Sequence, residues 1–367
     1  MFLTKLQLAQ FKNYEFAELE FSPKFNCFVG LNGMGKTNLL DAIYYMSFCK
    51  SFFNPVDYQN VRNGGAEFKL GATYQRKEQE EFLSCWVRKQ HRKQFKKNKK
   101  EYEKLLDHIG LFPLVMVSPY DIELIHGGSE LRRKFMDGII SQYDHNYLEN
   151  LLSYNKALQH RNALLKHFAK ERVYQKESLE IWDLQLESFA NCIFEARKKF
   201  VDAFIPIFNV YYEKVSGKKE EVSLSYRTQL DTSSMTEGLA QNLDKDLAVR
   251  YTSFGIHRDD LEFNIRQEQL KKFGSQGQQK TYLLALKLAQ YDYLRDQTKL
   301  KPILLLDDVF DKLDQERTSN LMKLLNSEEF GQVFVTDTGE ERIRNLFKDI
   351  SAEVRNFRVD DGVITSL

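Results

Sequence analysis

One short stretch of the sequence has the composition and spacing of a site that holds phosphate groups. Residues 30–37 read Gly-Leu-Asn-Gly-Met-Gly-Lys-Thr, which fits the pattern Gly-x4-Gly-Lys-[Ser/Thr] of a phosphate loop, or Walker A motif. The apolar run Phe25–Val29 precedes the loop and predicts a buried strand, and residues 38–46 carry apolar side chains on one helical face. Strand, glycine-rich turn and helix start form the context in which this motif binds a nucleotide.

Each residue type in this loop has a chemical role that its position explains. The glycines let backbone N–H groups curl around phosphate oxygens, and the start of the following helix adds positive potential there. We expect Lys36 to reach the β and γ oxygens and the hydroxyl of Thr37 to bind Mg²⁺. The predicted nucleotide-binding residues are Gly30, Leu31, Asn32, Gly33, Met34, Gly35, Lys36 and Thr37.

A second candidate group is a pair of carboxylates at the end of a predicted buried strand. The apolar run Ile303–Leu306 leads directly into Asp307 and Asp308. The pair could be two solvated carboxylates, but carboxylates at such a strand end are costly without a partner. Beside a phosphate loop, we expect Asp307 to hold Mg²⁺ together with Thr37, and Asp308 to orient or deprotonate the attacking water. Lys36, Asp307 and Asp308 are therefore the predicted catalytic residues.

Residues 273–280 place small side chains at the start of another predicted helix, from Gln276 to Leu294. The sequence is Phe-Gly-Ser-Gln-Gly-Gln-Gln-Lys, in which Ser275 supplies a hydroxyl and Gly277 permits close approach to a phosphate. This loop is similar to the signature loop of ABC-type ATPases, where the signature of one subunit faces the nucleotide of the other. The alternative is that Ser275 is an ordinary helix N-cap.

The rest of the chain must position these groups, and its composition is that of a globular protein. It has 367 residues, of which 42% are hydrophobic and 29% charged, and its formal net charge is +1. A near-neutral chain has no global field for a polyanion, so any polyanion must be held by a local patch. The four cysteines lack a Cys-x-x-Cys pair, which argues against a zinc site or a disulfide framework. Without a signal peptide or an apolar run of about 20 residues, we expect a cytoplasmic protein with no membrane span.

The period of the apolar residues divides the chain into a mixed α and β part and a helical part. Residues 1–118 read as short strands plus one helix, and the mixed pattern returns over residues 255–367. Residues 119–254 between them predict a mainly helical insertion, in which two long helices within Tyr143–Glu213 pair as an antiparallel hairpin. A charged segment, 170–180, makes the predicted turn, and a proline at 206 is expected to kink or end the second helix.

The densest positive cluster in the chain lies in the segment Arg88–Lys104. Its cations are Arg88, Lys89, Arg92, Lys93, Lys96, Lys97, Lys99, Lys100 and Lys104. One interpretation is a patch that contacts a polyanion. The other is a solvated hairpin whose lysines protect an edge strand from pairing.

Several segments, in order along nearly the whole chain, resemble the RecF family of bacterial DNA-repair ATPases. They are residues 6–14 (with Leu-x-x-Phe-x-Asn-Tyr), the phosphate loop, 117–121 (Val-Ser-Pro-Tyr-Asp), 127–137 with the pair Arg132-Arg133, 257–260 (His-Arg-Asp-Asp), 274–280, and 306–310 followed by Leu313-Asp314. This resemblance implies an α/β fold: an ABC-type phosphate-loop ATPase head of mixed sheets and helices, with an inserted helical hairpin subdomain.

The resemblance also implies a function. A member of this family is expected to bind ATP and Mg²⁺, to hydrolyse ATP weakly with stimulation by DNA, and to form an ATP-dependent homodimer. Ser275 and Gly277 would complete the nucleotide site of the partner subunit. The DNA would be gapped DNA or a junction of single and double strands, bound without sequence preference, in recombinational repair and replication restart. The implied protein partners are the RecO and RecR mediators that help load RecA.

Other phosphate-loop proteins are less well supported. A transport ATPase subunit usually carries a switch histidine after the strand at 333–335 and a Leu-Ser-Gly-Gly-Gln signature, but this chain has Thr336-Asp337-Thr338 and residues 274–278 instead. A chromosome-organising protein would need long coiled-coil arms, for which the helical stretch is short. A GTPase would carry Asn-Lys-x-Asp, and the nearest sequence, at 98–101, lies inside the basic run.

Overall fold

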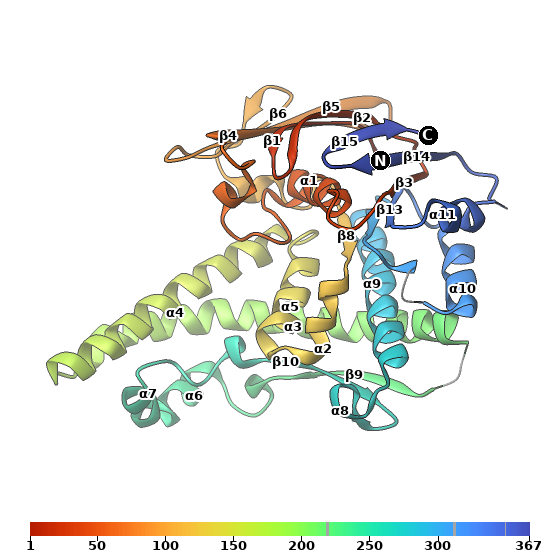
Figure 1. The fold of residues 1–367 in the computed structure, drawn as a ribbon. Coiled ribbons are helices and arrows are strands. Elements are labelled where there is room, and N and C mark those ends of the chain that lie inside the picture. Colours follow the sequence, from red (N-terminus) through yellow and green to blue (C-terminus); the bar gives the residue numbers. More distant parts are fainter. Residues whose placement is uncertain (218–219, 311–312, 349) are drawn as a thin grey trace. The chain divides into compact units, whose positions relative to one another are not determined.

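A computed structural model gives the fold of residues 1–217, 220–310, 313–348 and 350–367 (Figure 1). The chain forms two compact units, each built from separate parts of the sequence. The first unit combines Met1–Asp121, Tyr211–Lys218 and Thr281–Leu367, and the second combines Ile122–Val210 and Lys219–Lys280. The predicted domain boundaries, at residues 118 and 255, are defined on the sequence pattern and stay a prediction.

The first unit contains an antiparallel sheet and a mainly parallel sheet. The antiparallel sheet has the order β2-β1-β4-β5-β6-β7. Its strands are β1 (Phe2–Phe11), β2 (Tyr14–Glu20), β4 (Glu67–Arg76), β5 (Gln79–Arg88), β6 (Gln94–Lys97) and β7 (Lys100–Glu101). β1 and β2, and the strands from β4 to β7, are neighbours because short turns connect them. β1 and β4 are also neighbours, although residues 12–66 lie between them in the sequence.

The parallel sheet has the order β15-β14-β3-β13-β12-β8, in which only β15 runs antiparallel to its neighbour. Its strands are β3 (Phe25–Val29), β8 (Leu114–Val117), β12 (Ile303–Leu306), β13 (Val333–Asp337), β14 (Val354–Asp360) and β15 (Val363–Ser366). The predicted strands at 25–29, 303–306 and 333–336 are confirmed. Their nearly continuous apolar sequences are typical of strands that are covered on both faces.

The helices of the first unit are α1 (Lys36–Phe48), α10 (Gln315–Leu325), α11 (Glu340–Leu346), the part of α9 (Gln276–Thr298) that follows residue 280, and the end of α5 (Lys176–Ser216) from residue 211. Short 3₁₀ turns lie at Asp57–Asn60, Leu105–His108 and Pro119–Ile122. The predicted helix from Gln276 is confirmed and extends to Thr298.

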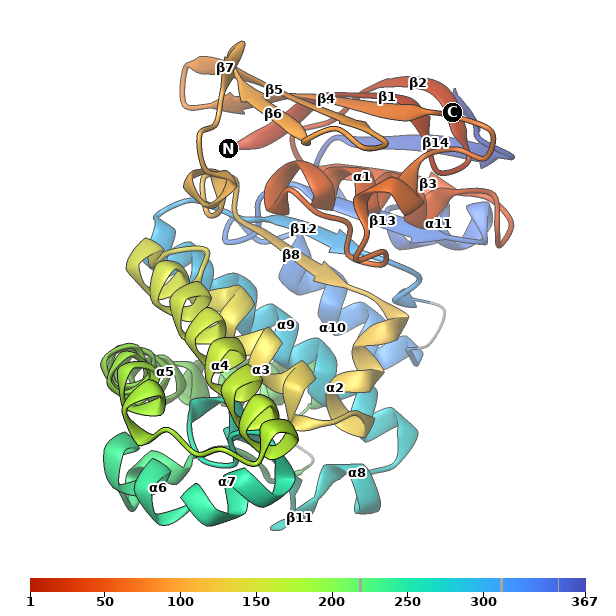
Figure 2. The same cartoon turned by 90° about the vertical axis from the view of Figure 1, so that its left-hand side faces the viewer.

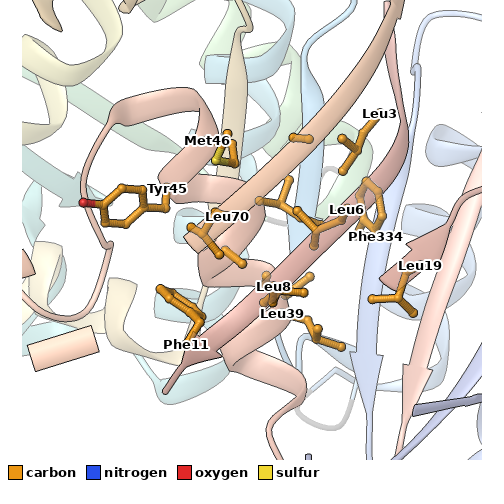
Figure 3. Close-up of a cluster of buried hydrophobic side chains, with 14 of the residues drawn as sticks. Leu3, Leu6, Leu8, Phe11, Leu19, Leu39, Tyr45, Met46, Leu70 and Phe334 are labelled. Carbon is orange, nitrogen blue, oxygen red and sulfur yellow. The ribbon is translucent and has the colours of Figure 1, made fainter. Parts of the chain in front are cut away.

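The core of the first unit lies between its two sheets, with α1 inside it (Figures 1 and 3). Leu6 and Leu8 of β1 and Leu70 of β4 point inward, and they meet Leu39 of α1 and Phe334 of β13. Each fully buried side chain of this kind contributes about 1.5–3 kcal/mol relative to exposure. Because α1 begins at the phosphate loop, this packing fixes the loop against both sheets.

The second unit is mainly helical and contains a small antiparallel sheet of order β11-β10-β9. Its helices are α2 (Glu123–His126), α3 (Ser129–Ile140), α4 (His145–Glu171), α5 (Lys176–Ser216, as far as residue 210), α6 (Met235–Gln241), α7 (Leu243–Val249) and α8 (Leu270–Phe273). The strands are β9 (Val222–Arg227), β10 (Asp260–Ile265) and β11 (Glu268–Gln269), and 3₁₀ turns lie at Gln229–Asp231 and Ile256–Arg258.

The predicted helical hairpin is confirmed as α4 and α5. Tyr147 near the start of α4 lies beside Arg197 of α5, with 3.1 Å between Oη and Nε, and Arg161 pairs with Asp183 at 2.6 Å. These two contacts fix the antiparallel register of the helices. The turn spans residues 172–175, so it is shorter than the charged segment that predicted it.

The proline at 206 does not end α5, which continues to Ser216. Proline removes one backbone hydrogen bond and crowds the preceding turn. Phe204 and Phe208 on either side of it are fully buried, and their burial offsets this local cost. Of the two predicted effects of this proline, a kink or an end of the helix, the end is therefore wrong.

A buried ion-pair network inside the second unit involves residues of two segments that carry the family resemblance, 127–137 and 257–260. Arg197, 2% exposed, pairs with Asp137 of α3 at 2.9 Å and with Asp259 at 2.7 Å. Arg132 forms a two-pronged pair with Asp260, at 2.7 and 3.0 Å. These ion pairs hold the segment 257–260 against the helices. Breaking one of them is costly, because the remaining charge would stay buried without its partner.

Candidate functional site

The phosphate loop joins β3 to α1 at the edge where the parallel strands end. All five residues of β3 are buried, and the strand pairs in parallel with β13 on one side and β14 on the other. Gly33 and Gly35 adopt φ angles of 83° and 114°, in the left-handed region that favours glycine. A Cβ atom at Gly35 would lie 2.4 Å from Nδ2 of Asn13, so only glycine fits there.

Lys36 lies inside the curve of this loop and is 4% exposed. Its Nζ donates hydrogen bonds to the carbonyl oxygens of Gly30 and Leu31, at 2.6 and 2.9 Å. Burial lowers the pKa of Lys36, while the nearby carboxylates, of which Asp308 and Asp307 act most strongly, raise it. The loop therefore holds one buried cation facing a group of acidic side chains.

A hydrogen-bonded network connects the loop to the predicted acidic pair. The hydroxyl of Thr37 lies 2.9 and 3.1 Å from the two carboxylate oxygens of Asp307 at the end of β12. Thr336 of β13 donates its hydroxyl proton to Asp307 at 2.8 Å and accepts the backbone N–H of Asp308 at 2.9 Å. The structure thus brings together three predicted site residues, Thr37, Asp307 and Asp308, and adds Thr336.

Asp308 has an unusual backbone and an unsatisfied side chain. Its φ angle is 48°, in the left-handed region, where aspartate is tolerated better than most side chains. Its Oδ1 atom is buried and has no hydrogen-bond partner among the residues that the structure describes. Strained backbone and an orphaned buried polar atom are both costly, and both concentrate at functional sites.

The donor set around Thr37 and Asp307 fits Mg²⁺. Mg²⁺ prefers hard oxygen ligands and is usually bound by one or two protein groups together with water and substrate phosphates. A hydroxyl and a carboxylate supply such oxygens here. Burial raises the pKa of Asp307, and its hydrogen bonds to Thr336 and Thr37 oppose this shift. The part of the chain that the structure describes has no cluster of three or more His, Cys, Asp or Glu side chains for a metal.

The predicted signature residues Ser275 and Gly277 belong to the second unit. Ser275 is exposed and lies at the start of α9, where its hydroxyl accepts the backbone N–H of Gln278 at 3.2 Å. The side chain of Gln278 accepts the backbone N–H of Ser275 in return, at 2.6 Å. Ser275 therefore has the geometry of a helix N-cap, and this geometry also leaves its surface open to a partner.

Comparisons with known proteins bear on this arrangement. The family model for the RecF/RecN/SMC N terminal domain matches residues 2–364. A curated protein of Flavobacterium johnsoniae, named DNA replication and repair protein RecF, is 47% identical over 359 residues, which cover 98% of this chain and all of the relative. The chain belongs to the RecF family. A relative of the same name from Phocaeicola vulgatus is 47% identical over 367 residues, covering 100% of this chain and 98% of the relative.

Solved structures agree with this RecF-family assignment. The structure of the recombination mediator protein RecF-ATP in the RecFOR pathway has a TM-score of 0.89 and 30% sequence identity, and covers 100% of this chain and 97% of that chain. The Smc head domain from Pyrococcus furiosus has a TM-score of 0.58 at 19% identity, which shows a shared fold. The predicted fold class is confirmed: an ABC-type ATPase head of mixed sheets and helices, with a helical insertion.

The basic run of this RecF-family chain does not form one uniform patch. Lys93 donates to the carbonyl oxygen of Cys49 at 2.6 Å and pairs with Asp57 at 2.7 Å, so it links β6 to the segment after α1. Lys97 pairs with Glu81 of β5 at 3.1 Å. Lys99 and Lys100 are exposed beside or on β7, the last strand of the sheet. The cations of this segment are therefore not equivalent, because Lys93 and Lys97 have structural partners.

Sequence reasoning missed the groups that support the phosphate loop from outside it. Asn13 donates to the carbonyl oxygen of Met34 at 3.0 Å, and the hydroxyl of Tyr14 donates to that of Gly35 at 3.0 Å. The backbone N–H of Gly362, in the turn between β14 and β15, also donates a hydrogen bond to the carbonyl oxygen of Met34, at 3.3 Å. Asn13 and Tyr14 lie in the first segment that resembles the RecF family, and this resemblance was the signal that could have identified them. The pair Asp361-Gly362, a typical hairpin-turn sequence, was the signal for the last turn.

Proposed function

We propose that this chain is an ATP-dependent DNA-binding protein of recombinational repair and replication restart. In this proposal two copies dimerise head to tail on ATP, bind gapped or junction DNA without sequence preference, and hydrolyse ATP slowly with stimulation by DNA. By family resemblance, RecO and RecR are its partners, and the dimer helps them to load RecA in the cytoplasm. No helix in the described residues is long and apolar enough to span a membrane.

The observation that carries the ATPase proposal is the network of Thr37, Asp307, Thr336 and Asp308. It places a hydroxyl and two carboxylates beside the helix start that follows the phosphate loop. RecF relatives solved with ATP share this fold over the whole chain. The network supports phosphoryl transfer to water, which needs positioned charges more than covalent chemistry.

Each residue then has a stated part in the reaction. Backbone N–H groups of the loop and the Lys36 ammonium hold the phosphates of ATP and neutralise the charge that develops during transfer. Thr37 and Asp307 would hold Mg²⁺, which would supply Lewis-acid chemistry for the transfer when bound. Asp308 accepts a proton from the attacking water through its unpartnered oxygen. Thr336 keeps Asp307 and the backbone of Asp308 in place.

Replacing Ser275 with arginine tests the composite site. A bulky cation at the start of α9 is expected to block the γ-phosphate of the partner subunit, while the phosphate loop of the same chain still binds ATP. We expect ATP affinity within about twofold of the unchanged chain and no ATP-driven dimer. Calorimetry measures the affinity, and light scattering with and without ATP measures the mass.

The matched control is Ser234→Arg. Ser234 caps α6 with the same reciprocal hydrogen bonds to the backbone and side chain three residues later, so this substitution has the same capping cost. The Ser234 variant is expected to dimerise normally. ATP-driven dimers in the Ser275 variant would show that this loop is only a helix cap.

The structure also separates the lysines of the basic run into two experiments. Lys99→Gln together with Lys100→Gln is expected to weaken duplex binding and to flatten its dependence on log salt, with a slope change of about 0.9 per lost phosphate contact. Lys93→Gln is expected instead to lower the melting temperature, because the carboxylate of Asp57 loses its cation. Fluorescence anisotropy over a salt series and thermal unfolding measure the two effects. If the salt dependence of the double variant were unchanged, Lys99 and Lys100 would not contact DNA and would only protect the edge strand from pairing.

A further inference from the structure

The outer face of the antiparallel sheet carries a hollow that the proposed reaction does not use. The α1 helix and the parallel sheet lie on the inner side of this sheet, and no described helix of the first unit covers the outer side (Figures 1 and 2). Strand pairing places the outward side chains in rows across the sheet. One row runs through Gln7, Gly71, Ser84 and Lys96, and the adjacent row through Phe16, Ala9, Lys69, Trp86 and Gln94.

The hollow exists because small side chains lie between large ones. It has a volume of about 430 Å³, with Gly71 at its floor. Phe16 and Trp86 wall one side of it, and Phe82, from the next row, reaches over the floor: its ring lies 3.5 Å from the point where a Cβ of Gly71 would be. Phe16 is 66% exposed and Phe82 39% exposed, which is unusual for side chains of this size.

The charged side chains that line the hollow are both cations. They are Lys69, whose Nζ lies 5.9 Å from the centre of the Trp86 ring, and Lys96. Lys96 has no salt-bridge partner among the residues that the structure describes. Two carboxylates near the rim are paired within the sheet, Glu18 with Lys5 and Glu67 with Lys69. At the neighbouring edge, Glu101 of β7 is the register partner of Lys96, whereas Lys100 is the partner of Lys97 on the other face of the sheet.

We propose that this face binds single-stranded DNA, with an unpaired base in the hollow between Phe16, Phe82 and Trp86. The inference rests on the proposed DNA-binding function and adds a site and a substrate class to it. Aromatic side chains bind bases of any sequence by stacking, and lysines beside them hold the phosphates. Lys69 and Lys96 are placed for the phosphates next to the stacked base.

The chemistry of the hollow favours a nucleic acid over an apolar protein segment. An apolar segment would gain from the rings but would cover the ammonium of Lys96, which has no salt bridge among the described residues, and this is unfavourable in a closed contact. A duplex base cannot enter, because its faces are already stacked on its neighbours. The site therefore distinguishes single strands from duplex, as a protein of junction DNA requires.

The two tryptophans of the chain make a direct test possible. Trp86 lies in the hollow, and Trp182 stacks on His160 in the second unit. In a Trp182→Phe background, Trp86 is the only tryptophan and reports on stacking at this site. A thymidine oligomer of about 12 nucleotides, within the site size of single-strand binding folds, is expected to quench its fluorescence.

Gly71→Val fills the floor of the hollow without removing a cation. Valine favours strand structure. Its Cβ would lie 3.0 Å from the side-chain amide oxygen of Gln7, the nearest atom, and this flexible side chain can move aside. This variant is expected to abolish the quenching and to weaken thymidine-oligomer binding by about tenfold, the effect of losing one stacked base. Duplex of equal length is expected to bind within about twofold of the unchanged chain.

Thr73→Val is the matched control, because Thr73 lies on the same face of β4 but outside the hollow. It is expected to bind both DNAs normally. Two outcomes would overturn the inference. In the first, the protein binds duplex but the oligomer does not change the fluorescence of Trp86. In the second, the Gly71 and Thr73 variants bind the oligomer with equal affinity, and a protein partner would then be the better occupant of this face. Failure to bind either DNA would overturn the proposed function itself, and the inference with it.

Discussion

Replacing Lys36 with methionine is expected to weaken ATP binding by about 100-fold and to abolish ATP-driven dimers. The ammonium is buried, lies within the phosphate loop, and interacts with the charges of Asp307 and Asp308. Methionine keeps most of the length of the side chain but brings no charge to the phosphates. Deleting one partner of a desolvated charge pair costs about 2–5 kcal/mol, and about 1.4 kcal/mol corresponds to a tenfold change in affinity. Calorimetry with ATP and light scattering measure both effects.

Lys24→Met provides a matched control in the same unit. Lys24 precedes β3, whereas Lys36 follows it, and Lys24 also donates to two backbone carbonyl oxygens, of Phe330 at 2.7 Å and Ser327 at 3.0 Å. Burial lowers the pKa of Lys24 as it lowers that of Lys36. The control separates the loss of a buried ammonium in general from the loss of a phosphate contact. ATP-driven dimers of normal stability in the Lys36 variant would refute the phosphate-loop assignment.

Replacing Asp308 with asparagine is expected to lower the ATP turnover rate by about 10²- to 10⁴-fold, the usual contribution of a general base. Asparagine has the same shape and tolerates the φ angle of 48°, so the backbone and its hydrogen bond to Thr336 are kept. Because Thr37 and Asp307 remain, ATP affinity is expected to stay within about twofold. The dimer is therefore expected to persist on DNA after ATP is added. Phosphate release and DNA dissociation kinetics measure the two outcomes.

Asp296→Asn, on an exposed part of α9, controls for the loss of one negative charge from the same unit. It is expected to leave turnover unchanged. An Asp308 variant that hydrolyses ATP at the normal rate would mean that another group activates the water. Asp337 would be the next candidate, because it ends β13 beside the loop and its carbonyl oxygen accepts the backbone N–H of Gly30 at 3.3 Å.

The parts of the site that sequence reasoning located are those whose signal is local. The phosphate loop is defined by glycines within a few residues, and the run of apolar residues before Asp307 marks a strand that ends at a polar pair. The helical hairpin was also visible, because long helices repeat their apolar period many times. These features depend on neighbours in the sequence, so no knowledge of the fold was needed.

Features that depend on distant residues could not be found in this way. The role of Thr336 follows from the pairing of β12 with β13, which no local pattern specifies. Lys93 looked like any other lysine of a charged run until Asp57 and Cys49 were seen around its Nζ. The hollow over Gly71 requires the register of four neighbouring pairs of strands, since its walls come from separate rows.

The position of β3 in the parallel sheet has a consequence for how the protein is made. Both partners of this strand, β13 and β14, come about 300 residues after it in the sequence, whereas the strands of the antiparallel sheet all lie within residues 2–101. During synthesis both edges of β3 therefore stay unpaired until β13 and β14 have been made. An apolar strand with unpaired edges attracts chaperones and promotes aggregation. The strand that leads into the phosphate loop therefore reaches its folded pairing only after β13 and β14 have been synthesised.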